Sequence, residues 1–114
     1  MGIYFGFLTM REINPFNSAI EVFRQHPTLR FIEVSNCGKV MKGSAPITPY
    51  KDAKGRYRVF LQYPRHGKIY CPFVDELVLQ TFNCYLEDVK IIHLNGKEKD
   101  CRIDNLYQPM KKKP

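Results

Sequence analysis

The sequence contains no tryptophan, no Cys-x-x-Cys pair and no low-complexity linker, and it lacks the run of about 20 apolar residues that a membrane-spanning helix needs. The first ten residues are apolar but lack the basic start of a secretion signal. The four cysteines lie 34, 13 and 17 residues apart, and no histidine stands at zinc-finger spacing from them. These absences predict a cytoplasmic protein with reduced, structural thiols, no cysteine-bound zinc and no membrane contact.

Enough apolar surface is present for one folded core. The chain has 114 residues, of which 44% are apolar and 13% are aromatic, so a single domain fits and global disorder is excluded. The formal net charge is +7, and a small basic protein most often meets a polyanion. Composition therefore favours nucleic acid as the partner.

A short helix is predicted near the N-terminus. Asn17 or Ser18 can cap it, Ile20 and Phe23 would share one face, and Pro27 would end it. The helix is expected over residues 17–24.

Extended segments are predicted for the middle of the chain. Residues 56–63 alternate so that one face of a strand packs and the other face is basic, and turn residues on either side predict antiparallel partners. The predicted segments are a hairpin of residues 31–35 and 39–42 around a turn at 36–38, a loop at 43–49, and a second hairpin of residues 56–63 and 68–71.

The main helix is predicted over residues 73–82, where apolar residues recur at helical spacing and two acids lie in the first turn. Beyond it, a strand at 89–94, an Asn-Gly turn and an extended segment at 102–107 form two antiparallel arms. These patterns predict an α+β fold, a small single domain of antiparallel hairpins and one main helix. The predicted core is Val74, Leu77, Val78 and Phe82 against the strand at 57–63, closed by Ile91 and Leu106.

Basic residues are concentrated in one window. Residues 39–68 hold eight bases and one acid, so these 30 residues carry +7 and the other 84 sum to zero. Tyr50, Phe60 and Tyr70 are interleaved with the basic residues, which is typical of surfaces that bind phosphates and contact sugars or nucleobases. The alternative is that the charge only aids solubility. The predicted nucleic-acid-binding residues are Lys39, Lys42, Lys51, Lys54, Arg56, Arg58, Arg65 and Lys68.

Three motifs follow one another in a recognisable order. Residues 31–41 read FIEVSNCGKVM, residues 74–82 read VDELVLQTF, and residues 91–96 read IIHLNG and are followed by DNL at 104–106. The first resembles the modular DNA-binding motif of phage HNH homing endonucleases, the second their Val-His-Arg-Leu-Val helix, and the third the centre of their nuclease site. The resemblance covers about residues 31–108 and implies an HNH-like, truncated ββα-metal core.

In the family that the chain resembles, a neutral histidine accepts a proton from the attacking water while a carboxylate and an Asn or His hold one divalent metal ion. The resemblance implies His93 as this base. The carboxylate position beside it is Ile92, and Asp75 stands at the position of the first family histidine. Few residues follow Asn105, so we expect no ligand-bearing helix.

The resemblance therefore predicts a degenerate site with no metal and no other cofactor. His93 is expected as a vestigial base, with a structural histidine bonded to the backbone as the alternative. Asn105 is expected as a vestigial site residue or as a residue that ties the loop to the sheet. Substitute oxygen ligands for Mg²⁺ or Mn²⁺, needed only if the site is active, would be Asn95, Asp100 and Asp104.

Three functions remain open at this stage. The favoured one is a nucleic-acid-binding protein, with DNA preferred over RNA, in which HNH catalysis is lost. The alternatives are a structural subunit of a virion or ribonucleoprotein that docks through the apolar N-terminal arm, and an active metal-dependent HNH nickase. The expected organisation is an arm and short helix at 1–30, an HNH-like domain at 31–110 and a basic tail at 111–114, in the host cytoplasm or a virion.

Overall fold

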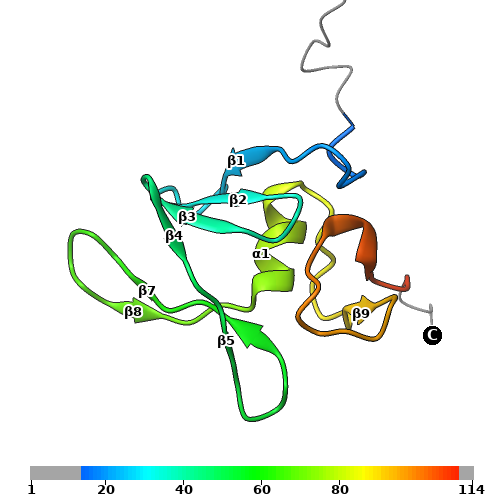
Figure 1. The fold of residues 1–114 in the computed structure, drawn as a ribbon. Coiled ribbons are helices and arrows are strands. Elements are labelled where there is room, and N and C mark those ends of the chain that lie inside the picture. The colour runs from blue at the N-terminus through cyan, green and yellow to red at the C-terminus, as the bar shows by residue number, and fades with distance from the viewer. Residues whose placement is uncertain (1–13, 111–114) are drawn as a thin grey trace, which may run out of the picture.

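The computed structural model describes residues 14–110, which form an α+β fold of short antiparallel strands around the helix α1 (Val74–Thr81) (Figure 1). The helix is confirmed where the apolar spacing predicted it. The N-terminal arm as far as residue 13 and the basic tail at 111–114 lie outside the described residues, so docking through the arm stays a prediction.

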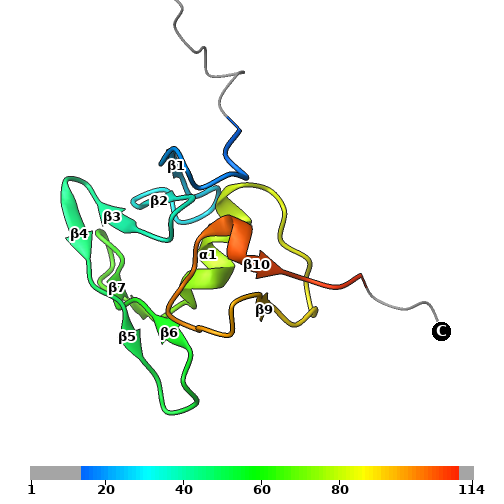
Figure 2. The ribbon, with the colours of Figure 1, turned by 45° about the vertical axis from the view of Figure 1, so that its right-hand side comes forward.

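A four-stranded antiparallel sheet lies on one side of α1, with its strands in chain order (Figures 1 and 2). The predicted hairpin is confirmed as β2 and β3, and Val34 lies opposite Val40. The predicted loop at 43–49 is wrong in part because β4 pairs with β3; Pro46 fits because β4 is an edge strand. The strands are β1 (Phe23–Gln25), β2 (Glu33–Ser35), β3 (Val40–Lys42) and β4 (Ala45–Ile47).

The predicted helix at 17–24 is wrong, because this segment forms turns and then β1. The side chains of Asn14 and Asn17 each accept a hydrogen bond from the backbone N–H two residues further on, at 3.0 and 2.9 Å. Such local bonds compete with a helix. Ile20 and Phe23 are 49% and 39% exposed, so the apolar face that would have stabilised a helix has nothing to pack against.

The predicted strand at 56–63 is broken in its middle. Its first part, β6 (Tyr57–Arg58), pairs with β5 (Tyr50–Lys51), whereas its second part, β7 (Leu61–Gln62), pairs with β8 (Ile69–Tyr70). Between the two, the Val59 N–H donates a hydrogen bond to the Pro72 carbonyl at 3.1 Å, so the strand changes partner there. The result is two hairpins that project from the body in different directions (Figure 1).

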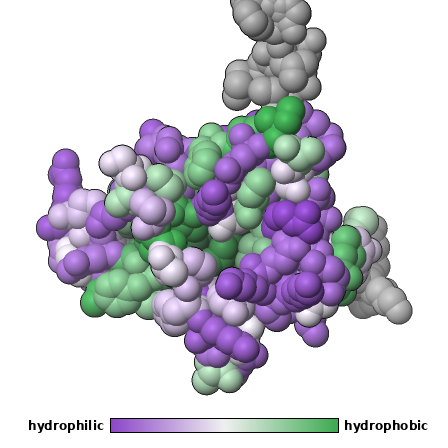
Figure 3. Space-filling view, viewed as in Figure 1, coloured by the Kyte–Doolittle hydropathy of each residue, from purple (hydrophilic) through white to green (hydrophobic). Residues whose placement is uncertain are grey.

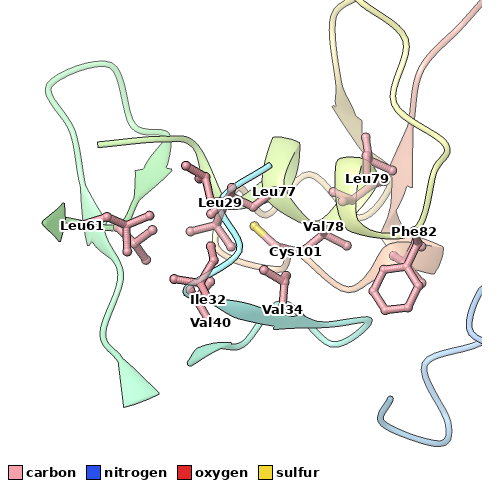
Figure 4. Close-up of a cluster of buried hydrophobic side chains, with 14 of the residues drawn as sticks. Leu29, Ile32, Val34, Val40, Leu61, Leu77, Val78, Leu79, Phe82 and Cys101 are labelled. Carbon is pink, nitrogen blue, oxygen red and sulfur yellow. The ribbon is translucent and has the colours of Figure 1, made fainter. Parts of the chain in front are cut away.

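The core lies between α1, the four-stranded sheet and the start of the hairpins (Figure 4). The predicted core residues of the helix are all buried, and Val59 and Leu61 pack as the alternation predicted. The four-stranded sheet also contributes side chains to the core, which the sequence did not indicate. Its buried apolar side chains are Val34 and Val40, and Ile32, directly before β2, is buried with them.

The C-terminal arm consists of β9 (Ile92–His93) and β10 (Leu106–Tyr107), which pair antiparallel as predicted. The strand is shorter than the predicted range of 89–94. A single turn of 3-10 helix, η1 (Ile103–Asn105), precedes β10 and contacts α1. His93 lies opposite Leu106, so the arm holds this histidine against the helix.

Candidate functional site

His93 is buried between β9 and the first turn of α1. Its side chain is 1% exposed, and Nδ1 lies 3.1 Å from the Asp100 carbonyl oxygen. Nε2 lies 3.1 Å from Oδ2 of Asp75 and 3.7 Å from Oε1 of Glu98. Both ring nitrogens therefore face protein atoms.

Asp75 is the second residue of α1, and its buried carboxylate contacts both the His93 ring and the Arg56 guanidinium. Arg56 donates to Oδ1 from Nη2 at 2.9 Å, and the Glu76 N–H donates to the same oxygen at 2.8 Å. The Arg56 guanidinium also lies 3.5 Å from the centre of the Phe73 ring. Such stacking and pairing stabilise a planar cation in one position.

Asn105 binds the loop between β9 and η1. Its Oδ1 accepts from the Asn95 N–H at 3.0 Å, and its Nδ2 donates to the Asp100 carbonyl at 2.8 Å. These contacts fit a residue that ties the loop to the sheet, while a vestigial catalytic role for Asn105 stays a prediction.

The three acids and amides considered as substitute metal ligands have other partners. Asp100 pairs with Arg102 at 2.8 Å, and this hydrogen bond lowers the pKa of the Asp100 carboxyl to about 2. Asn95 donates to Asp100 at 2.7 Å, and Asp104 accepts from the Ser18 hydroxyl at 2.9 Å. The acids that do approach Nε2 of His93 are Asp75 and Glu98.

The sequence interpretation did not place Asp75 and Glu98 in the site. Asp75 was explained by the helix dipole, and Glu98 belongs to a charged loop with no pattern of its own. A signal did exist for Asp75, since it occupies a motif position at which the resembled family has a histidine.

Of the eight predicted phosphate-binding residues, two face inward. Arg56 pairs with Asp75, and Arg58 pairs with Asp52 at 3.0 Å and donates to the Cys71 carbonyl at 2.9 Å. Lys42 is half-buried and donates to the Gln62 carbonyl at 3.0 Å. The exposed bases are Lys39, Lys51, Lys54, Arg65 and Lys68.

Four of these five exposed bases lie on the two projecting hairpins, and Lys39 precedes β3. Lys51 and Lys54 belong to the β5–β6 hairpin, while Arg65 and Lys68 lie in and beside the turn of the β7–β8 hairpin. Both projections carry hydrophilic surface in the space-filling view (Figure 3). Exposed aromatic rings accompany them, namely Tyr50 at 40%, Phe60 at 54% and Tyr70 at 45%.

Within residues 14–110, no helix is long and apolar enough to cross a membrane.

A comparison with solved structures finds a chain with a similar fold. The similar chain comes from a structure described as "DNA binding and cleavage by the HNH homing endonuclease I-HmuI", with a TM-score of 0.66 and 23% sequence identity. The match covers 77% of this chain and 52% of that chain, so this chain spans about half the length of the endonuclease chain. No protein-family model and no curated protein matches the sequence.

Proposed function

We propose that this protein binds DNA through its two basic hairpins and has lost HNH cleavage. The segregation of positive charge onto the hairpins carries the first part of the proposal. The buried His93, whose Nε2 lies against the Asp75 carboxylate, supports the second part.

The hairpins have the chemistry of a phosphate-binding surface. Lysine and arginine side chains at two separate tips can contact the backbone at two places along a duplex, and the exposed rings between them can pack on sugars or bases. The HNH endonuclease with the similar fold binds DNA according to its description, which supports DNA as the polyanion.

His93 is in a poor position to act as a general base. A base must come within hydrogen-bond reach of the attacking water, directly or through one water molecule. The His93 side chain is 1% exposed, and its Nε2 faces Asp75. The neighbouring Ile92 cannot bind a metal ion, since its side chain has no lone pair. Both features support a loss of catalysis.

Binding is tested by measuring the affinity for a DNA duplex at several salt concentrations. Replacing four exposed hairpin bases by glutamine should weaken binding uniformly across sequences and lower the salt slope by roughly 0.9 for each phosphate that the variant no longer neutralises. The four substitutions are Lys51→Gln, Lys54→Gln, Arg65→Gln and Lys68→Gln.

A control with the same reduction of charge separates local binding from net charge. The control replaces exposed bases elsewhere, namely Arg30→Gln, Lys90→Gln, Lys97→Gln and Lys99→Gln. Its salt slope should stay closer to that of the parent. Equal slopes in the two quadruple variants would mean that the hairpins are not the DNA interface.

Loss of cleavage is tested with supercoiled plasmid in Mg²⁺ or Mn²⁺. The plasmid should remain intact, because Ile92 offers no metal ligand beside His93 and the Asp75 carboxylate lies against Nε2 of His93. Metal-dependent nicking that His93→Ala abolishes would overturn this part of the proposal and establish the nickase instead.

A further inference from the structure

Three potential metal ligands from separate segments meet at one point. Asp75 comes from α1, His93 from β9 and Glu98 from the loop after β9, and their ligand atoms all lie within 4.8 Å of one another. His93 Nε2 is 3.1 Å from Asp75 Oδ2 and 3.7 Å from Glu98 Oε1. The first separation lies within the range of roughly 3.0 to 3.4 Å expected between ligands of an ion whose bonds are about 2.1 Å long, and the second is a few tenths of an ångström longer.

The contacts of the imidazole place Nε2 against a carboxylate oxygen, and such a contact is favourable only when a cation or a proton lies between the two atoms. A carbonyl oxygen can only accept, so Nδ1 carries the proton that it donates to Asp100. In the neutral ring, Nε2 then presents a lone pair toward a carboxylate oxygen that also has only lone pairs. A backbone carbonyl on the far nitrogen is a usual way to aim a metal-binding histidine.

The local charge also fits a divalent cation. Two carboxylates, those of Asp75 and Glu98, lie against the imidazole, and the Arg56 guanidinium pairs with Asp75. Arg56 donates its hydrogen bond to Oδ1 of Asp75, so Oδ2 remains available to bind an ion.

The cluster is open to solvent on the side of Glu98. A hollow of about 160 Å³ lies beside it and is lined in part by Glu98, Arg56 and Glu76, and the Glu98 side chain is 45% exposed. Water can complete the coordination from this side.

We propose that Asp75, His93 and Glu98 bind a divalent transition-metal ion that fastens α1 to the C-terminal arm. One imidazole with two carboxylates suits zinc or manganese better than magnesium, which prefers oxygen ligands alone. His93 is a ligand in this site, so it is not a base, and the site is separate from the family position occupied by Ile92. The proposal does not depend on DNA binding.

The test is a calorimetric titration of the reduced full-length chain with Zn²⁺. The parent protein should bind one equivalent, and at a free Zn²⁺ concentration of about 100 times Kd its Tm should rise by roughly 10 °C or more. Glu98→Gln should weaken the binding at least about tenfold while leaving the metal-free Tm unchanged, since Glu98 is on the surface. Glu33→Gln, an exposed acid on β2, is the matched control and should bind like the parent.

Two further readouts distinguish this site from a cysteine site and from a simple ion pair. Co²⁺ in place of Zn²⁺ should give a spectrum without a thiolate charge-transfer band, and such a band would mean that cysteines hold the ion. A proton that NMR finds on His93 Nε2 in saturating Zn²⁺ would mean an imidazolium–carboxylate pair and would overturn the site. An unchanged Zn²⁺ affinity in Glu98→Gln would also overturn the site.

Nicking of plasmid by the Zn²⁺-loaded protein would contradict the proposed loss of cleavage and leave the ligand set intact.

Discussion

At the scale of single residues, Asp75 shows how a contact within the candidate site can escape a sequence-based prediction. The resembled family has a histidine there, and this chain has a carboxylate 3.1 Å from His93. The sequence indicated the substitution but not the contact, because the two residues are 18 positions apart and belong to different elements. Only the packing of β9 against α1 brings them together.

Asp100 illustrates the opposite case. Its residue type and its place near His93 made it a reasonable candidate ligand. Arg102, two positions further along, binds both carboxylate oxygens at 2.8 Å and so satisfies the charge locally. Short-range pairs of this kind can be anticipated from an acid and a base at close spacing, and they reduce the number of acids available to a metal.

At the scale of secondary structure, the elements that were predicted correctly are those specified by local sequence. Helix α1 has apolar residues at helical spacing throughout, and the β2–β3 hairpin has a turn at Gly38, whose φ of 90° suits glycine. The failures involve partners outside each segment, together with the local Asn14 and Asn17 bonds in the N-terminal turns. The Pro72 carbonyl at Val59 divides the predicted strand, and pairing with β2 makes residues 23–25 a strand instead of helix.

The end of α1 is expected to be a major contributor to stability. Phe82 follows the helix, is 2% exposed, and has the Arg24 guanidinium 5.0 Å from its ring centre. Phe82→Ala should lower the free energy of unfolding by about 3 to 5 kcal/mol, because it leaves a cavity in the core. Urea denaturation measures the change. Phe60→Ala, at a ring that is 54% exposed, should change the stability by less than about 0.5 kcal/mol; similar losses in both variants would contradict this description of the core.

At the scale of the whole molecule, Asn36 connects three regions that are far apart in the chain. Its Oδ1 accepts from the Val22 N–H at 2.8 Å, and its Nδ2 donates to the carbonyls of Pro15 and Ile20 at 3.0 and 2.9 Å. Its own carbonyl accepts from the Ile103 N–H at 2.8 Å, next to the C-terminal arm. A side chain of the motif at residues 31–41 thus holds residues 14–22 against the rest of the structure by hydrogen bonds.

This connection predicts that the N-terminal turns unfold together with the core. Asn36→Asp replaces the donor Nδ2 by an oxygen that faces two carbonyls, so it should lower the free energy of unfolding by about 3 to 5 kcal/mol, the cost of an unpaired buried charge. Asn83→Asp is the control, since Asn83 is exposed and its φ of 59° is tolerated by aspartate. Hydrogen exchange of the Val22 and Ile103 amides should report the same loss of protection in Asn36→Asp, because both bonds end on Asn36. Faster exchange at Val22 alone, with an unchanged urea midpoint, would mean that residues 14–22 open independently of the rest.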